Sequence, residues 1–344
     1  MQGSVGKKKV IAAVFAWQVT VFDLQITFFS TSGYSLVNSK LRRSIFMADH
    51  TRFGPAGVPQ MFRLMGAKLA DVPRLLHCEN LDAFEYAAVR WGQIPQIKRE
   101  DAEILGEEAR KNDVILSMHG SYFINMFGEK EIAEASKRRL VACAQAAEWM
   151  GAYVVVFHAG FYGKNGKGET MHKCISALKE VSSTLKSLGI KKVKLGIETM
   201  GRHSQFGTLD EVLEVCQEVE GTQLVIDWSH LHARSGGALK TADDFRKIAV
   251  AAEQKVGTET IRNMHCHFSK IEYTYKSGER RHHVLDEKGF GPEFEKLAEV
   301  ILEFKLRPVI ICETAIQDLD AVKMRNILGD LATRKRDNFL QEPA

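Results

Sequence analysis

From about residue 50 onward, short apolar runs alternate with longer segments whose apolar residues recur at helical spacing. The apolar runs are rich in Val, Ile and Leu, which is typical of strands buried on both faces. The clearest runs lie at residues 114–118, 154–157, 193–197, 224–226 and 309–312. The segments between them have the periodicity of amphipathic helices, for example residues 98–111, 131–150, 170–188 and 292–304.

Less regular strands at residues 52–57, 82–89 and 261–267 complete a set of eight strand–helix units. Strands that alternate with helices form parallel sheets, and eight units in a chain of 344 residues favour a closed (β/α)8 TIM barrel over an open sheet. A long polar loop is expected at residues 269–291. The loop after the first strand does not match GxGxxG, which argues against a dinucleotide-binding fold.

The α/β barrel is expected to form a single domain over residues 47–338, with residues 1–46 as an extension outside the fold. An apolar run at residues 10–22 follows three lysines, but Gln18 interrupts it and Asp23 ends it. It is too short and too interrupted for a membrane-spanning helix, so we expect no membrane association. A signal peptide is the less favoured alternative.

The composition is that of a globular protein, with 45% hydrophobic and 26% charged residues. A net charge of +4 permits a polyanionic partner without requiring one. The six cysteines are scattered and include no CxxC pair, which indicates a reducing, cytoplasmic compartment and no disulfide framework.

Histidine or carboxylate residues follow almost every predicted strand. In a barrel of parallel strands the carboxyl ends meet on one face, so residues that are far apart in sequence converge there. One such residue is weak evidence, because a lone histidine at a strand end is usually structural. The full set is His119, His158, Glu198, Asp227 with His230, His265 with His267, Glu313, and the loop residues His282 and His283.

So many imidazoles and carboxylates do not share one pocket without compensation, because desolvation and like charges oppose it. Bound divalent cations would offset both the desolvation of these groups and the repulsion between them. Mixed imidazole and carboxylate ligands suit zinc, with manganese or iron as alternatives. The sequence therefore predicts a metal site with more than one ion.

With these residues the chain resembles the endonuclease IV family, the zinc-dependent apurinic/apyrimidinic (AP) endonucleases within the xylose-isomerase-like barrels. The resemblance runs from residue 52 to the last helix. It rests on HGSYFIN at 119–125, FHAG at 157–160, GIE at 196–198, IDWSH at 226–230, MH at 264–265, RHH at 281–283 and CET at 312–314.

The resemblance implies where each metal would bind. One ion would be held by His119, His158 and Glu198. A second would be held by Glu198, Asp227, His265 and Glu313. Strand alternation places His267 on the same side as His265, so either histidine fits, and we expect His265. A third ion would be held by His230, His282 and an aspartate.

That aspartate is missing, because Arg280 stands at its position. Two zinc ions are therefore expected, and the third depends on a substitute. Either Glu279 or Asp286 supplies the ligand, or Arg280 replaces the ion by binding a phosphate oxygen.

The resemblance implies cleavage of double-stranded DNA on the 5′ side of an abasic site, leaving a 3′ hydroxyl, by a monomer. Glu198 would bridge two metals and Glu313 would also orient the attacking water. Tyr122 would fill the gap left by the abasic nucleotide. The alternative is a sugar or sugar-phosphate isomerase or epimerase on the same barrel, because such enzymes also use Glu, Asp, His and Glu around a divalent metal. A non-catalytic barrel is the remaining class.

Overall fold

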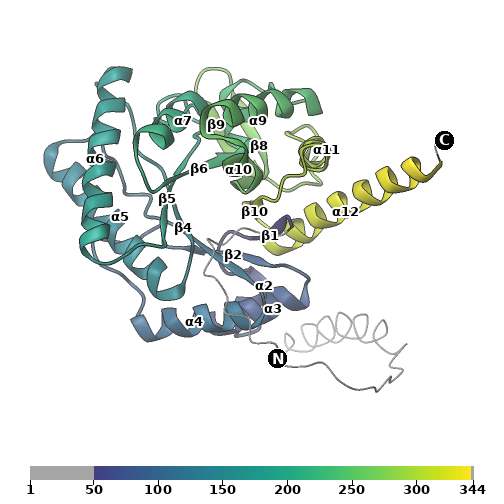
Figure 1. The fold of residues 1–344 in the computed structure, drawn as a ribbon, viewed down its shortest axis with the longest axis horizontal. Coiled ribbons are helices and arrows are strands. Elements are labelled where there is room, and N and C mark those ends of the chain that lie inside the picture. Colours follow the sequence, from purple (N-terminus) through teal and green to yellow (C-terminus); the bar gives the residue numbers. More distant parts are fainter. Residues whose placement is uncertain (1–49, 342–344) are drawn as a thin grey trace, which may run out of the picture. The chain divides into compact units, whose positions relative to one another are not determined.

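Eight parallel strands form a barrel in the computed structural model, which describes residues 50–341 (Figure 1). The strands follow one another around the barrel in the order β1-β10-β7-β6-β5-β4-β3-β2. Their bounds are β1 Arg52–Pro55, β2 Ala83–Ala87, β3 Ile115–His119, β4 Val154–Phe157, β5 Lys194–Glu198, β6 Thr222–Asp227, β7 His265–Phe268 and β10 Val309–Cys312. This confirms the predicted TIM barrel. The expectation for residues 1–46 lies outside the described residues.

The ring closes between β1 and β2. A parallel bridge joins Ala56 to Glu85, and the amide of Gly57 donates to the Glu85 carbonyl over 2.8 Å. At the other end of the seam, the amide of Asp82 donates to the carbonyl of Phe53 over 3.0 Å. These contacts join the two end strands of the sheet and close the barrel, so their edges are less open to another strand than those of an open sheet.

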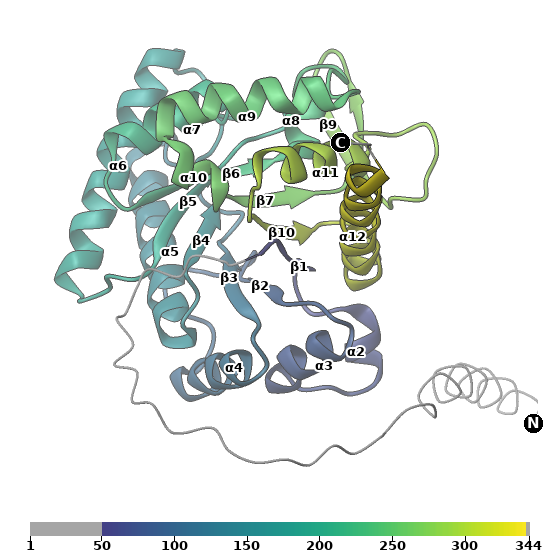
Figure 2. The same ribbon diagram turned by 45° about the vertical axis from the view of Figure 1, so that its right-hand side comes forward.

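Helices surround the strands on the outside (Figure 2). They are α2 Gln60–Leu64, α3 Val72–Cys78, α4 Arg99–Lys111, α5 Lys130–Met150, α6 Lys167–Ser187, α7 Leu209–Glu218, α8 Trp228–Arg234, α9 Ala242–Val256, α10 Thr258–Arg262, α11 Phe294–Phe304 and α12 Gln317–Gln341, with a short 3-10 helix at Leu69–Asp71. Thr208 caps α7 as its position predicts, since its hydroxyl accepts from the Glu211 amide while the Glu211 carboxylate accepts from the Thr208 amide.

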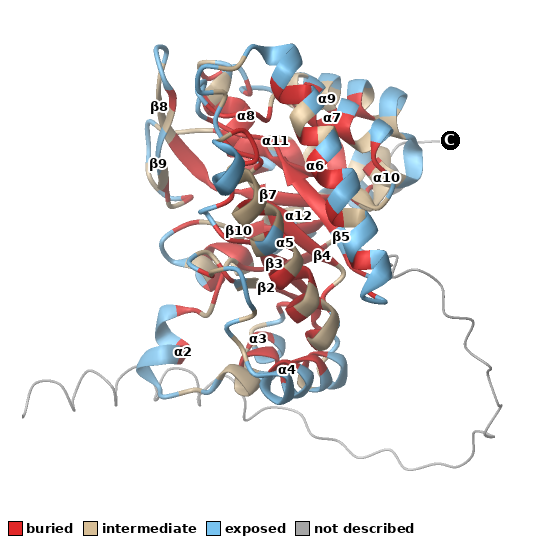
Figure 3. Cartoon of the chain, turned by 90° about the vertical axis from the view of Figure 1, so that its left-hand side faces the viewer, coloured by how far each residue is buried: buried red, intermediate tan, exposed pale blue. Residues whose placement is uncertain are grey.

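The core lies between the barrel wall and the helices (Figure 3). The barrel strands are almost wholly buried, whereas the outward faces of the helices are exposed. Trp228 is fully buried and packs its ring against Phe245 with 5.2 Å between ring centroids. None of the helices in the described part of the chain combines the length and apolar character that crossing a bilayer requires.

Two predicted elements differ from the structure. Residues 258–262 form helix α10, so β7 begins only at His265 and not at residue 261. The expected loop at 269–291 contains an antiparallel hairpin, β8 Lys270–Thr274 and β9 Gly278–His283, which lies beside α8. The hairpin is mostly polar, so it lacks the apolar run by which the barrel strands are recognised.

Candidate metal centre

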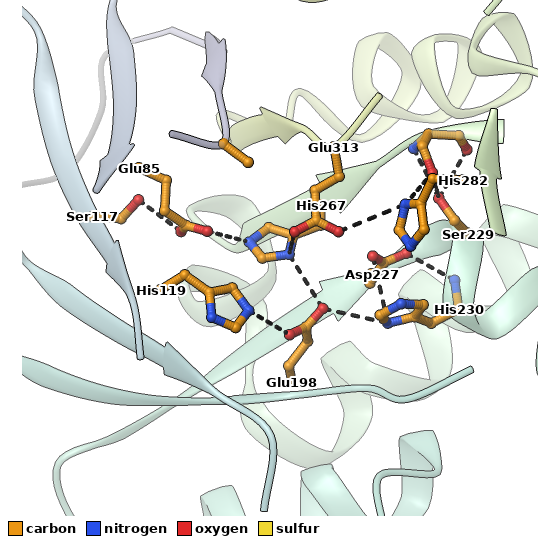
Figure 4. A network of polar contacts seen from close by, with 12 residues as sticks. Glu85, Ser117, His119, Glu198, Asp227, Ser229, His230, His267, His282 and Glu313 are labelled. Carbon is orange, nitrogen blue, oxygen red and sulfur yellow. Dashed lines mark hydrogen bonds and ion pairs between the residues drawn. The ribbon is translucent and has the colours of Figure 1, made fainter. Parts of the chain in front are cut away.

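The carboxyl ends of the barrel strands bring the predicted ligands together (Figure 4). His119, Glu198 and Asp227 are the last residues of β3, β5 and β6. His158 and Glu313 follow β4 and β10 directly. Because all eight strands are parallel, these five side chains reach one end of the barrel, as the sequence predicts.

Glu198 lies at the centre of the cluster. Its Oε2 atom is 2.9 Å from His158 Nε2 and 3.5 Å from His119 Nε2. Its Oε1 atom is 3.2 Å from His267 Nδ1 and 3.3 Å from His230 Nδ1. The two oxygens of one carboxylate thus face two different sets of imidazoles, which is the arrangement that a bridging ligand needs.

Two groups of possible ligands share Glu198. His119, His158 and Glu198 form the first, and Glu198, Asp227, His267 and Glu313 form the second. Within each group the ligand atoms lie within 4.8 Å of one another.

The second group contains His267, whereas the sequence analysis expects His265. His265 lies deeper in the barrel, where its Nε2 is 3.1 Å from Glu85 and its Nδ1 is 2.5 Å from the Tyr153 hydroxyl. Both histidines point to the inside of the barrel, as alternation requires, but only His267 stands beside Glu198 and Glu313. The geometry favours His267 as the ligand.

A third group consists of His230, Glu279 and His282. Glu279 Oε2 lies 3.5 Å from His230 Nε2. Glu279 is therefore the carboxylate that this group contains in place of the missing aspartate. Asp286, the other candidate, forms an ion pair with Lys323 at the surface.

A β-bulge explains why the third group contains Glu279. Glu272 pairs with Arg281 and Tyr273 pairs with Glu279, so Arg280 is the extra residue between them. The bulge interrupts the alternation of β9, which allows Glu279 to share a side with His282. Arg280 is exposed and binds Glu272 over 2.8 Å.

The hairpin approaches the barrel through two glycines. The Glu279 amide donates to the carbonyl of Gly201 over 3.2 Å, and a Cβ on Gly201 would lie 2.7 Å from the Glu279 Cβ. Gly278 has a φ of +79°, and a Cβ there would lie 2.1 Å from the Gly201 oxygen. Side chains at these two positions would keep Glu279 away from His230.

Backbone carbonyls select the tautomer of two histidines. His119 Nδ1 lies 3.0 Å from the Gly120 carbonyl, and His230 Nδ1 lies 2.9 Å from the Thr199 carbonyl. A carbonyl only accepts, so each Nδ1 carries a proton, and Nε2 is the nitrogen that each ring can offer to a cation. Metal-binding histidines are commonly oriented in this way.

The carboxylates and imidazoles of the cluster shift each other's protonation. Burial alone would raise the pKa of Glu198, but His267, His158 and His119 outweigh it and hold that pKa well below its usual range. Burial likewise opposes protonation of His230, yet Asp227 and the nearby glutamates raise its pKa well above the usual value. Glu313 differs, because burial raises its pKa.

The residues present suit divalent cations. Glu198 Oε2 and Asp227 Oδ2 are buried and accept no hydrogen bond from any described residue. Four carboxylates and five imidazoles belong to these three ligand groups, so several carboxylates adjoin one another at the mouth of the barrel. Cations would compensate both the unsatisfied oxygens and the repulsion between carboxylates.

A small cavity of about 220 Å³ opens at the mouth beside the cluster. Its walls include Tyr122, His282, Glu313, Thr314 and Gln317. The Tyr122 ring stacks on His158 with 5.3 Å between centroids, and just over half of this residue remains exposed. Tyr122 therefore forms the border between the metal cluster and the outside.

Sequence reasoning overlooked one buried group. Glu85, on β2, lies with His265 and His267 in a fourth set of possible ligands. A carboxylate inside an otherwise apolar strand was the available signal, because such a group requires a partner.

Comparisons with known proteins agree with this architecture. A family model described as xylose isomerase-like TIM barrel matches residues 76–329. An uncharacterized protein of Methanocaldococcus jannaschii, MJ0133, is 34% identical over 280 residues, which are 81% of this chain and 97% of that protein.

Solved structures with the same fold include both chemical classes considered above. Endonuclease IV from Thermus thermophilus aligns with a TM-score of 0.59 at 20% identity, covering 76% of this chain and 94% of that one. A D-tagatose 3-epimerase-like protein aligns with a TM-score of 0.54 at 18% identity, covering 76% and 91%. The chain thus belongs to the xylose isomerase-like TIM barrel family.

Proposed function

We propose that this protein is a metal-dependent AP endonuclease, which hydrolyses the phosphodiester bond 5′ to an abasic site in double-stranded DNA. The observation that carries the proposal is the number of adjoining ligand groups. Three groups surround the mouth, two of them sharing Glu198 and the third completed by Glu279. An isomerase that works with one metal has no use for the additional ligands at His119, His158, His230 and His282.

Zinc is the cation that this mixture of imidazole and carboxylate donors suits best, and manganese is the alternative. Such cations, when bound, supply the positive charge that stabilises a phosphodiester under attack and that activates water. His119, His158 and Glu198 would hold one ion. Glu198, Asp227, His267 and Glu313 would hold another, and His230, Glu279 and His282 a third.

The chain's own side chains would guide the hydrolysis. The oxygen of water forms a bond to phosphorus as the water gives up a proton. The bond from phosphorus to the 3′ oxygen breaks, and that oxygen takes up a proton from solvent and leaves as a hydroxyl. Glu313 borders the cavity and has a raised pKa, so it is suited to orient the water and accept its proton. Glu198 holds two sets of imidazoles in place with its two oxygens.

Tyr122 and Arg280 are the proposed DNA contacts. Tyr122 is half exposed and held by its stacking on His158, so it is placed to fill the gap at an abasic nucleotide. Arg280 protrudes from the hairpin and is available to a phosphate if it leaves Glu272.

A sugar isomerase or epimerase is the second candidate, for one specific reason. Glu198, Asp227, His267 and Glu313 alone form a four-ligand group that contains two glutamates. That group is sufficient for proton transfer at a carbon next to a metal-bound carbonyl or hydroxyl. A D-tagatose 3-epimerase-like protein has the same fold, which is compatible with this second candidate.

The test is nicking of a duplex oligonucleotide that carries one tetrahydrofuran abasic analogue. Purified protein with a measured zinc content is assayed with and without chelator, against an undamaged duplex. Glu313→Gln is the variant expected to lose at least 100-fold in rate. Asp286→Asn, at the surface ion pair with Lys323, is the matched control.

A metal-dependent cut immediately 5′ of the analogue, absent from undamaged DNA, supports the proposal. No cut by metal-loaded protein overturns it. A parallel assay for interconversion of ketohexoses then decides whether the epimerase is the correct function.

A further inference from the structure

We propose that Glu85 is a positioning residue, which orients His267 so that the Nδ1 atom of this histidine faces the second ligand group. The inference rests on the proposed metal centre, but it concerns a carboxylate outside the three groups at the mouth. It assigns a role to the buried network of Glu85, His265 and Tyr153 below the site.

The position of Glu85 follows from the strand register. It pairs with Ser117 on the neighbouring β3, and the Ser117 hydroxyl donates to Glu85 Oε2 over 2.9 Å. The same oxygen lies 3.1 Å from His265 Nε2. All three side chains are buried, so this carboxylate has no access to water and depends on these donors.

The second oxygen of Glu85 faces only His267. Glu85 Oε1 lies 3.1 Å from His267 Nε2, and the structure gives neither atom a hydrogen bond to a described residue. On the other side of the ring, Nδ1 hydrogen-bonds Glu198 Oε1 over 3.2 Å. A cation bound at Nδ1 would take the lone pair of that nitrogen, which leaves the single proton of the neutral ring on Nε2, facing the accepting oxygen of Glu85.

The other side of the His267 ring points to the metal ligands (Figure 4). Nδ1 lies 3.2 Å from Glu198 Oε1 and 3.3 Å from Glu313 Oε1. His267 is thus placed between an orienting carboxylate and the proposed cation. His119 and His230 use backbone carbonyls for the same purpose on their opposite nitrogens.

His265 and Tyr153 hold Glu85 in turn. The Tyr153 hydroxyl lies 2.5 Å from His265 Nδ1, and both residues are packed inside the barrel near its other end. If Tyr153 donates to Nδ1, His265 Nε2 carries the proton and donates to Glu85. The network therefore runs from Tyr153 through His265 and Glu85 to His267.

A buried cation between Glu85, His265 and His267 is the rival interpretation of these residues. It would require His267 to bind one cation with each nitrogen, since its Nδ1 already faces Glu198 and Glu313. Orientation by hydrogen bonds requires no deprotonated ring and uses every donor present.

The test is metal affinity in Glu85→Gln. An amide has one accepting oxygen, which Ser117 and His265 would occupy, so its NH2 group would face His267 Nε2. The proton of His267 would then move to Nδ1, where it competes with the metal. Chelator competition should show one zinc ion bound about 10–100-fold more weakly, with the same number of ions at saturation. Ser117→Ala, which leaves both carboxylate oxygens, should change the affinity less than about 3-fold.

Three outcomes contradict the inference. Equal affinity in Glu85→Gln and wild type would show that Glu85 does not position a ligand. Loss of one ion at saturation in both Glu85→Gln and His265→Ala would show that the buried residues bind a metal themselves. A His267 tautomer with the proton on Nδ1 in zinc-loaded wild type, measured by 15N NMR, would refute it even if the variant does not fold.

The inference and the proposed function fail separately. Wild-type protein that binds zinc but leaves abasic DNA uncut would remove the nuclease proposal and leave the role of Glu85 to be measured. Wild-type protein that binds no divalent cation would remove both.

Discussion

Glu79 and Asp318 form a pair of carboxyl groups between the end of α3 and the first turn of α12. Burial, followed by the charge of Asp318, raises the pKa of Glu79 to about 7. Burial also raises the pKa of Asp318, although amides at the start of α12 partly stabilise its charge. Near neutral pH the pair therefore begins to lose the proton that it holds at lower pH.

This pair makes the stability fall as the pH rises. The folded pKa of about 7 exceeds the ordinary value of 4.5, so the folded state holds the proton more tightly than the unfolded chain. The stabilisation is complete below pH 4.5 and is lost as the pH passes through about 7. This difference between the folded and unfolded pKa of Glu79 changes the free energy of unfolding by at most about 3 kcal/mol. Partial exposure of Glu79 reduces that change to about 1–2 kcal/mol.

Glu79→Gln should remove the repulsion because the amide resembles the protonated acid. At pH 8.5 the variant should be more stable than wild type by about 1–2 kcal/mol, or about 2–4 °C in melting temperature. At pH 5 the two should agree within about 0.5 kcal/mol. Calorimetry at both pH values, with one fixed zinc concentration, measures the difference.

The difference between variant and wild type is the relevant quantity, because other groups, among them His230 with its raised pKa, also make the stability depend on pH. Glu218→Gln, at an exposed position on α7, is the control and should show no pH-dependent difference. Equal stability of Glu79→Gln and wild type at pH 8.5, or a less stable variant there, would refute the repulsion between Glu79 and Asp318.

Two further predictions concern the third ligand group and the contact between α4 and α5. Glu279→Gln should reduce the zinc content at saturation from three ions to two per chain, whereas Arg280→Ala should leave it at three; mass spectrometry of the native protein counts the ions. Gly106→Ala should destabilise the fold by about 1–3 kcal/mol in urea unfolding, because the new Cβ would lie 2.3 Å from the Met150 carbonyl oxygen. Unchanged stability would contradict this, because it would show that α4 can move to accommodate the new Cβ without lowering the free energy of unfolding.

The barrel was predictable because its strands are buried on both faces and read as apolar runs. The hairpin of β8 and β9 was not, since it is polar and its pairing depends on contacts with Gly201 and the barrel. The same hairpin determines the third ligand group. A bulge at Arg280 changes which residue faces His282, and counting along the sequence does not reveal a bulge.

The choice between His265 and His267 depended on depth in the barrel, which periodicity does not encode. Both point inward, but the strand register places His267 level with Asp227 and places His265 level with Val225. Side chains inside a TIM barrel lie in layers, and ligands of one metal must come from neighbouring layers at the mouth. Glu198 pairs with Val225 and so lies level with His265, which leaves both histidines possible by register alone. The distances from His267 Nδ1 to Glu198 and Glu313 decide in favour of His267.

The same register explains why the layer below the metal ligands is polar. Ala87 is level with His119, so Glu85 lies one layer deeper on β2, as His265 does on β7. Apolar residues usually fill this layer, and a carboxylate there is stable only if its oxygens are satisfied. Ser117, His265 and His267 are placed to satisfy them, and His267 alone also reaches the ligand layer. A buried Glu85 that served stability alone would need no contact with a proposed ligand, so this connection favours a role for Glu85 in metal binding.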